Sequence, residues 1–155
     1  MKALTILLLA VLTTSINKCS SEELKSLKKD MVIEYEAKTR GSISKLIVRK
    51  DSLIVMEEFR NEGVYYYPLA SKDWDNIVKE VQKVDPEKVR SYKAPSKKRA
   101  TDAARAAQIK VIHNDKIYDS NVFDEGNPPT ELKTLVDKVA DLYLNHKKKI
   151  AKNDD

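Results

Sequence analysis

The chain has 155 residues and a formal net charge of +5, with 29 lysine and arginine residues interspersed among 24 aspartate and glutamate residues. This length suits one domain and is short for two, and a charge this mild and mixed describes a solvated surface, so we expect no nucleic-acid partner. The single cysteine excludes an internal disulfide.

The N-terminus has the features of a secretory signal peptide. Lys2 precedes an uncharged apolar block at residues 3–12, and small polar residues follow at positions 13–15, which is the order of regions in such a signal. The block is shorter than the ~20 apolar residues that a membrane-spanning helix needs. Residues 1–18 are therefore predicted to be a signal peptide, and its removal lowers the net charge from +5 to +3, because Lys2 and Lys18 leave with it.

Cys19 directly follows this segment. Its position resembles the lipobox of bacterial lipoproteins, in which the cysteine becomes the acylated first residue, and Ile16 suits the aliphatic position of that motif. Asn17 and Lys18 depart from it, because small residues normally stand there. We expect lipidation at Cys19. The alternative is cleavage near residues 13–15, which leaves a free thiol in a soluble periplasmic or secreted protein.

Residues 19–30 are predicted to be a lipidated tether. The stretch SSEE at residues 20–23 resembles the export signals of surface-displayed lipoproteins in some Gram-negative bacteria. The same stretch fits a capping box that opens a short helix through Leu24 and Leu27, and both interpretations can hold together. The expected location is the cell envelope, lipid-anchored at the outer membrane or cell surface.

Residues 31–67 are predicted to form an antiparallel meander of four short strands. Residues 31–39 alternate between apolar and charged side chains, which is typical of a half-buried strand. The breaks between the strands are too short for parallel crossover connections. The other three strands are expected at residues 43–49, 53–59 and 64–67.

The apolar period then changes to that of a helix. Ser71 is a good N-cap, and apolar residues repeat at helical spacing as far as Val81. Asp85 and Pro86 are expected to start a second short helical turn. Residues 91–104 have no apolar period and are predicted to be a loop.

A hairpin and a last helix complete the predicted domain. The hairpin strands are expected at residues 108–113 and 116–123. Asn127 is expected to cap a helix whose first turn carries two prolines. The predicted inner stripe of this helix is Leu132, Leu135, Val136, Val139, Leu142 and Tyr143. Residues 146–155 are predicted to be a charged tail.

The predicted order of elements is therefore ββββαββα. An antiparallel sheet, built from a four-strand meander plus a hairpin, with two helices packed on one face, is an α+β fold. One domain is expected at residues 31–145. The mature chain is long enough to bury an ordinary core without a metal or a disulfide, and we expect no cofactor.

Patterns for catalysis or metal binding are sparse. His113 and His146 have no second ligand at metal-binding spacing. Asp124 and Glu125 form the best acidic pair, and Asp102 could approach them for acid–base work. The alternative is structural, since negative groups at a helix N-terminus stabilise the helix by ~0.3–1 kcal/mol. We favour the structural role and expect neither a catalytic nor a metal site.

Three consecutive tyrosines, Tyr65, Tyr66 and Tyr67, make the most distinctive candidate binding surface. Alternation places Tyr65 and Tyr67 on one face of a strand and Tyr66 on the other, so at least one ring is expected to be exposed. Exposed tyrosines favour interfaces. The alternative is that the rings lie over the sheet beneath the helices. Asp102 and Asp124 are included in the candidate surface.

Residues 118–139 contain a series of short motifs: YDS at 118–120, FD at 123–124, and two prolines before an apolar helical stripe. With the helix around Trp74, this series resembles the C-terminal half of emfourin-like domains, in which a strand ends near an acidic residue and a proline-led helix closes the fold. The founding member looks like a protein inhibitor of thermolysin-type metalloproteases, so the resemblance implies protease inhibition. The chain lacks the glycine-rich first hairpin of that family, since Gly41 stands there alone.

The sequence thus predicts an exported, lipid-anchored envelope protein that acts as a non-enzymatic protein-binding module, with a protease or another envelope protein as its partner. Binding is expected through the edge of the meander, its turns or the tyrosines. One alternative is a structural envelope lipoprotein without a discrete ligand. A second is a hydrolase using Asp102, Asp124 or Glu125, which requires these acids to share a pocket and at least one shifted pKa.

Overall fold

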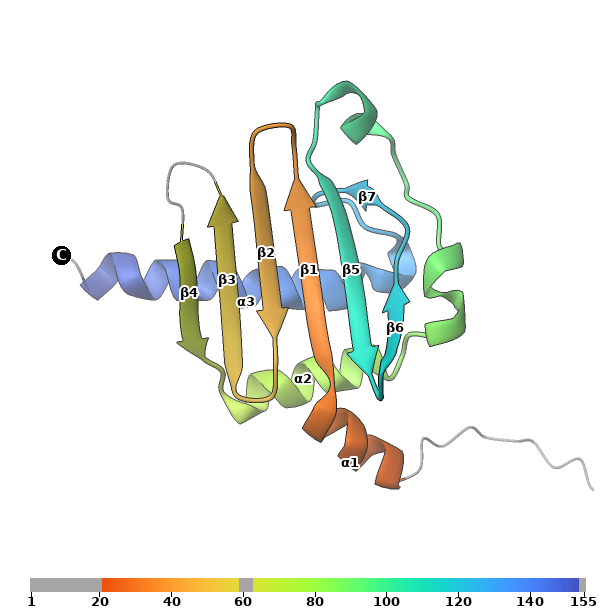
Figure 1. Cartoon of the computed structure of the whole chain (residues 1–155), viewed down its shortest axis with the longest axis vertical. Coiled ribbons are helices and arrows are strands. Elements are labelled where there is room, and N and C mark those ends of the chain that lie inside the picture. The colour runs from red at the N-terminus through yellow and green to blue at the C-terminus, as the bar shows by residue number, and fades with distance from the viewer. Residues whose placement is uncertain (1–20, 59–62, 154–155) are drawn as a thin grey trace, which may run out of the picture.

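Seven strands form one antiparallel sheet in a computed structural model that describes residues 21–58 and 63–153. The order across the sheet is β4-β3-β2-β1-β5-β6, and β7 pairs with β5 (Figure 1). The strands are β1 (Val32–Lys38), β2 (Ile43–Val48), β3 (Ser52–Glu58), β4 (Gly63–Pro68), β5 (Ala106–His113), β6 (Lys116–Asp119) and β7 (Phe123–Asp124).

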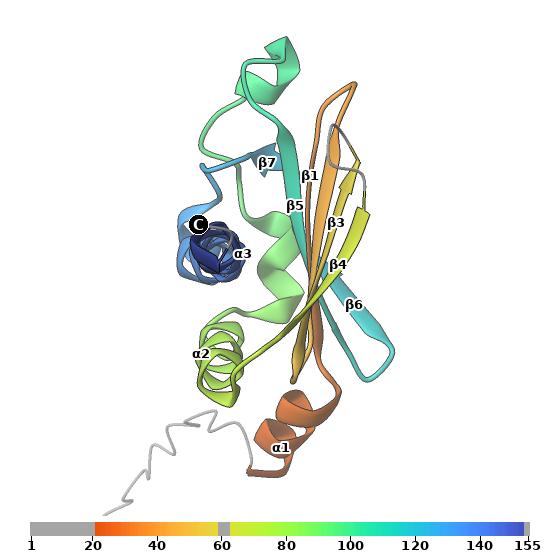
Figure 2. The ribbon, with the colours of Figure 1, turned by 90° about the vertical axis from the view of Figure 1, so that its left-hand side faces the viewer.

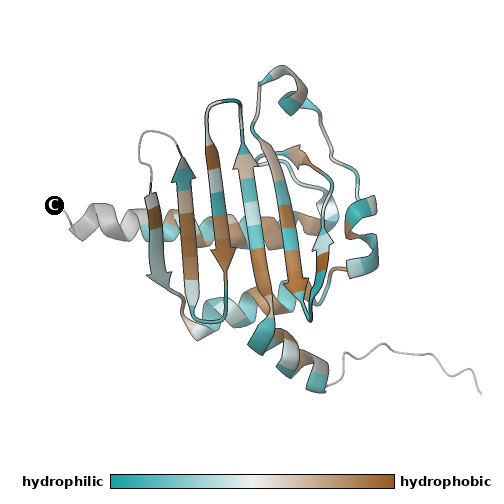
Figure 3. Ribbon diagram, viewed as in Figure 1, coloured by the Kyte–Doolittle hydropathy of each residue, from teal (hydrophilic) through white to brown (hydrophobic). Residues whose placement is uncertain are grey.

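The side chains of β1 explain why this segment forms a strand. Ile33, Tyr35 and Ala37 are buried on one face, whereas Glu34 and Glu36 are half-buried on the other. Figure 3 shows the same alternation of hydrophobic and hydrophilic residues along β1 and β5. A strand with one apolar face is stable only when that face packs against other elements, here the helices.

The second hairpin joins the meander along β1. Ile33 of β1 lies opposite Val48 of β2 and also opposite Val111 of β5. Consequently β1 has a hydrogen-bonded neighbour on each side, and the four meander strands and the hairpin make one continuous sheet.

Two helices, α2 (Ser71–Val81) and α3 (Lys133–Asn153), pack on the same face of the sheet, and none of the described helices covers the opposite face, which we call the bare face (Figure 2). Trp74, Ile77 and Val78 of α2 are at most 2% exposed, and each such buried apolar side chain contributes about 1.5–3 kcal/mol. Most of the inner stripe predicted for the last helix is confirmed, because Leu135, Val136, Val139 and Leu142 of α3 are buried. Of the other two predicted residues, Leu132 is buried but precedes α3, and Tyr143 is only partly buried.

Short 3-10 helices connect the larger elements. The helical turn predicted at Asp85 is confirmed, because the Asp85 carboxylate accepts a hydrogen bond from the Glu87 backbone N–H. The predicted loop at 91–104 contains a further 3-10 helix. These helices are η1 (Pro86–Ser91), η2 (Lys98–Thr101) and η3 (Thr130–Leu132).

The α+β class is confirmed, but the predicted order ββββαββα is not, because a helix precedes the strands and the last predicted strand is divided. That strand, expected at residues 116–123, forms β6 and β7. At the break, the Ser120 hydroxyl oxygen accepts the Ile109 N–H at 3.2 Å, while the Ser120 N–H donates to the Ile109 carbonyl at 2.9 Å. A side chain that takes a hydrogen bond of the ladder interrupts the strand.

The helix before the strands is α1 (Ser21–Asp30), which lies in the segment predicted to be a tether. The short helix predicted there is confirmed, and Leu24 and Leu27 pack against the core. The indole N–H of Trp74 donates to the Lys28 carbonyl at 2.9 Å. The described part of the predicted tether is therefore a docked helix rather than a linker.

Some predictions fall on residues that the structure does not describe. The signal peptide at residues 1–18 and the lipidation site Cys19 lie outside the described residues. At the other end, α3 continues as a helix to Asn153, through most of the predicted tail at 146–155.

Candidate functional site

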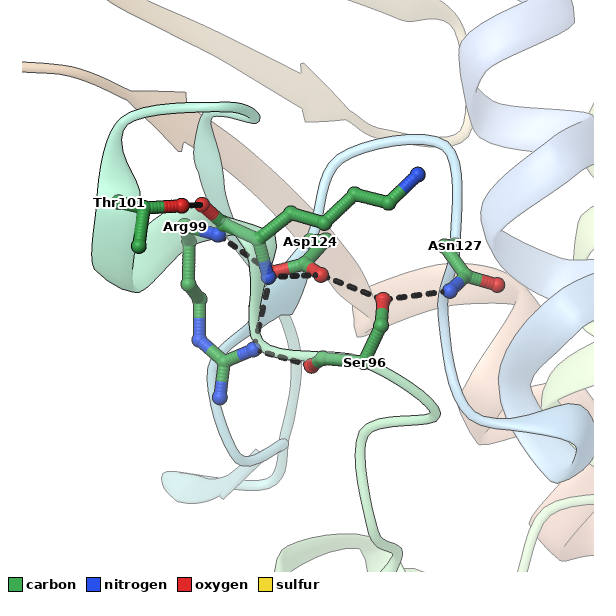
Figure 4. A network of polar contacts seen from close by, with 6 residues as sticks. Ser96, Arg99, Thr101, Asp124 and Asn127 are labelled. Carbon is green, nitrogen blue, oxygen red and sulfur yellow. Dashed lines mark hydrogen bonds and ion pairs between the residues drawn. The ribbon is translucent and has the colours of Figure 1, made fainter.

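The carboxylate of Asp124 lies at the centre of a buried hydrogen-bond network (Figure 4), with only 1% of the residue exposed. Its Oδ2 atom accepts hydrogen bonds from the Ser96 hydroxyl at 2.5 Å and from the Lys98 backbone N–H at 2.8 Å. Its Oδ1 atom accepts from the backbone N–H of Arg99 at 3.0 Å and from the Arg99 guanidinium at 2.9 Å. The network therefore joins β7 to the segment around η2.

The charge of Asp124 follows from these donors. Burial by itself raises the pKa of the Asp124 carboxyl, but the hydrogen bonds from Ser96, Arg99 and Lys98 outweigh burial and hold the pKa well below its ordinary value of 3.8. The group is therefore ionised at neutral pH. Its four donors match the roughly four lone-pair sites of a carboxylate, which leaves none to bind a metal or to take a substrate proton. The geometry favours the structural role predicted for Asp124.

The other two acidic candidates have separate partners. Asp102 is exposed, and its carboxylate lies 3.6 Å from Nε of Arg40. Glu125 forms a bidentate ion pair with Arg105. A cavity next to α3 includes Glu125 in its lining but neither Asp102 nor Asp124. The three acids therefore do not share the pocket that acid–base catalysis between them requires.

The turn after Asp124 corrects the prediction for Asn127. The Asn127 side chain does not cap the last helix; its amide donates to the Ser96 hydroxyl at 2.7 Å, and its backbone N–H donates to the Asp124 carbonyl at 2.8 Å. Gly126 has a φ of +76°, a conformation that favours glycine. The turn is followed by η3, which begins after Pro129 without a side-chain cap and leads directly into α3.

The structure places the β4 tyrosines on both faces of the sheet, so each of the two predicted alternatives holds for part of the set. Tyr65 and Tyr67 pair with Val55 and Leu53 of the core, and therefore face the helices. The Tyr67 ring stacks on His146 of α3, with 4.9 Å between ring centroids. Tyr66 lies on the bare face of the sheet and is 71% exposed. One ring is thus covered by a helix and one is open to solvent.

The two edges of the sheet are unequal. The β6 edge lies beside η1, where Arg90 forms an ion pair with Asp119 and its carbonyl accepts the Asn121 side-chain amide at 2.5 Å; η1 is the light green turn next to β6 in Figure 1. At the opposite edge, β4 is the outermost strand. Val64, Tyr65 and Tyr66 are exposed there, so β4 is the open edge of the described sheet.

The backbone of β4 has a defined alternation. The Leu69 N–H donates to the Asp51 carbonyl at 2.9 Å, so these two residues are a hydrogen-bonded pair and every second residue of β4 faces β3 in the same way. The register then directs the backbone groups of Tyr65 and Tyr67 toward β3 and those of Val64 and Tyr66 outward. Outward groups at an open edge can receive another strand.

The histidines and the described acids do not form a metal site. The His113 ring is hydrogen-bonded to the Ser26 hydroxyl at 3.0 Å, and within residues 21–58 and 63–153 no group of three or more His, Cys, Asp or Glu side chains could hold a metal ion. No helix in those two segments has both the length and the apolar character to cross a bilayer.

A cavity of about 250 Å³ lies between the sheet and α3, and sequence reasoning missed it. Its polar lining includes Tyr35, Arg105 and Glu125. The hydrogen bond from Arg105 to Glu125 raises the pKa of the guanidinium, and burial raises the pKa of Tyr35 to about 12. Tyr35 lies in β1, Arg105 directly precedes β5 and Glu125 directly follows β7, so no local pattern in the sequence connects them.

Comparison with protein-family models and with curated proteins finds no match to this chain. The resemblance of residues 118–139 to emfourin-like domains therefore stays a prediction from the sequence.

Proposed function

We propose that the protein is an exported envelope protein, anchored through a lipid on Cys19, that binds an extended segment of another protein along the open edge of β4. The observation that carries this proposal is the exposure of Val64 and Tyr66 on the one edge strand that no described element covers. The partner is an envelope protein or, as the sequence resemblance suggests, a thermolysin-type protease.

Strand addition accounts for both the backbone and the side chains of this edge. The outward N–H and C=O groups of Val64 and Tyr66 supply hydrogen bonds to an added strand. Pro68 continues the same outward alternation but has no N–H, so it limits the ladder at that end. The exposed Tyr66 ring lies on the bare face beside the added strand, where tyrosine favours protein contacts.

The anchor sets where this edge operates. One residue separates Cys19 from α1 (Ser21–Asp30), and α1 is docked on the domain through Trp74. An acylated Cys19 therefore holds the domain close to the membrane surface. Acylation that leaves more than one chain on the protein gives stable anchoring, whereas one chain gives marginal binding.

The strand-addition proposal is tested by photo-crosslinking in cells. A photoreactive residue at Tyr66 is expected to give one discrete cross-linked protein, and the same residue at the exposed Ile117 of β6 is not. Val64→Pro removes an outward N–H and should abolish the cross-link from position 66, whereas Val64→Ala should retain it. No discrete product from position 66, or a product that Val64→Pro leaves unchanged, would overturn the proposal.

Two further measurements test the anchor and the partner class. Cys19→Ser is expected to release the chain from the membrane fraction of the envelope; retention of the variant would contradict lipid anchoring.

The purified chain is expected to slow a thermolysin-type protease, with Val64→Pro losing the effect and Val64→Ala keeping it. If the protease is not slowed, that partner class is removed, while the cross-linking experiment still decides strand addition.

A further inference from the structure

The cavity beside α3 has a mostly apolar lining. Leu46 and Val55 of the sheet face Val136 and Ala140 of α3 across a volume of about 250 Å³. Cavities smaller than this bind molecules of the size of benzene when they are apolar and well formed. The space therefore suits a small molecule with an apolar body.

One end of the cavity is polar and carries a closed ion pair. The Arg105 guanidinium donates to both carboxylate oxygens of Glu125 and, at 3.0 Å, to the Ser44 hydroxyl. On the α3 side, the Tyr143 hydroxyl donates to Glu57. A ligand head at this end meets a guanidinium that is already paired, and the described lining has no second cation to attract a ligand carboxylate.

Tyr35 supplies the donor that the protein itself does not use. The residue is 94% buried, since 6% is exposed, and its side chain lines the cavity. Its hydroxyl makes no hydrogen bond with any described residue, yet no fully enclosed side-chain nitrogen or oxygen of the described residues lacks a partner. The hydroxyl is therefore reachable from the cavity. A tyrosine hydroxyl is already protonated near neutral pH at its ordinary pKa of 10.0, which burial raises further, and a protonated phenol donates.

We propose that this cavity binds a small amphipathic molecule whose apolar body lies between the sheet and α3 and whose neutral carbonyl oxygen, of an amide or an ester, accepts the Tyr35 hydroxyl. An ammonium head cannot accept that hydrogen bond, and a carboxylate head finds no unpaired cation in the described lining, because Arg105 is already paired with Glu125. Leaving a buried donor without a partner is costly, so a site of this kind is expected to select ligands that satisfy it. This site is separate from the β4 edge.

The test is a titration of the Cys19→Ser full chain with hexanamide, followed by the methyl NMR signals of Leu46, Val55 and Val136. Saturable shifts are expected for hexanamide, and weaker binding for hexanoate and hexylamine, which have the same apolar body. Tyr35→Phe should weaken hexanamide binding about three- to tenfold, the range that one hydrogen bond supplies. Its melting temperature should stay the same or rise, because the variant removes an unpartnered donor.

Two variants keep the result decisive. Ala140→Leu fills the cavity from α3 and should block hexanamide binding, even if Tyr35→Phe folds poorly. Val64→Pro, which disables the β4 edge, should leave the titration unchanged, so the two proposals fail independently. The inference is overturned if hexanamide gives no saturable shifts, if Tyr35→Phe binds it as tightly as the native chain, or if the charged probes bind equally well.

Discussion

Asp124 illustrates how one side chain can hold two distant parts of this chain together. Its donors are Ser96, Lys98 and Arg99, which precede it by 25 to 28 residues. Two of the four hydrogen bonds come from backbone N–H groups, which need an acceptor when they are removed from water. The ionised carboxylate therefore fixes the path of the segment before β5 as well as the turn into α3.

Replacing Asp124 by Asn is expected to lower stability and to change its pH dependence. The pKa of the folded carboxyl is held below the ordinary value of 3.8, so between these values the unfolded chain binds more protons. The contribution of Asp124 is present above pH 4 or so and is lost as the pH falls through the folded pKa. Urea unfolding at pH 7, 4 and 3 should show a lower midpoint for Asp124→Asn at pH 7 and a shallower fall on acidification.

The matched control is Asp102→Asn, because Asp102 is exposed and its one ion-pair partner among the described residues is the exposed Arg40. Its urea midpoint should stay close to that of the native chain. Some acid sensitivity remains in every variant, since hydrogen bonds from Arg90 and Lys28 also lower the pKa of Asp119 and of Asp75. Parallel pH curves for the native chain and Asp124→Asn would contradict the role assigned to this carboxylate.

For single residues, the sequence predicted that Asp124 has a structural role but did not predict which residues it contacts. It favoured a structural use of Asp124, yet placed it at a helix N-terminus instead of against the 96–99 segment. It did not single out Tyr35 or Arg105. The periodic spacing of apolar residues indicates which side of an element is buried. It does not indicate these contacts, because they join segments that are far apart in the sequence.

Among the elements, α1 depends most clearly on a few contacts with the rest of the domain. Leu24 and Leu27 are only partly buried, and a helix of 10 residues is marginal by itself. Its backbone is fixed by the hydrogen bond from the Trp74 indole to the Lys28 carbonyl. That bond spans 46 residues of sequence, so α1 is stabilised by tertiary contact rather than by propensity.

Trp74→Phe is therefore expected to loosen α1 specifically. The loss of the indole N–H removes about 1 kcal/mol of hydrogen bonding, and the smaller ring leaves a gap in the core, since Trp74 is 2% exposed. Hydrogen exchange measured by mass spectrometry should show faster exchange at Ser21–Asp30 than in the native chain, with a smaller change in β1.

The comparison variant for α1 is Asp75→Asn. It removes the 2.8 Å ion pair with Lys28, in which both side chains are more than 40% exposed, and exposed pairs of this kind contribute little. Exchange at α1 should be unchanged. If Asp75→Asn loosens α1 as much as Trp74→Phe does, then the surface charges and not the indole hold the helix.

The sequence predicted the bounds of an element best where its apolar residues are regularly spaced. The meander strands and α2 begin and end within one or two residues of the predicted bounds, because alternating or helical side-chain patterns specify them directly. The division into β6 and β7 was missed, since it depends on the Ser120 hydroxyl replacing a backbone carbonyl opposite Ile109. The docking of α1 was missed because its main partner lies in another helix.

For the whole molecule, the decisive feature is that β1 is central while β4 is terminal. β1 pairs with β2, its neighbour in sequence, and with β5, which comes in the chain only after the other three meander strands and α2. The core therefore closes when β5 docks on β1, and α2 and α3 cover one face of the joined sheet (Figure 2). β4 contributes no fully buried side chain to that core.

This asymmetry predicts a graded pattern of native-state hydrogen exchange. The amides of β1 are paired on both sides and should exchange only through global unfolding, because opening β1 breaks the core. In β4 the amides of Tyr65 and Tyr67 face β3 and should be protected, whereas those of Val64 and Tyr66 point outward and should exchange rapidly. Residue-resolved exchange by NMR measures both contrasts. Protection of the Val64 and Tyr66 amides in the isolated chain would mean that the β4 edge is already covered, and an edge already covered cannot receive a partner strand.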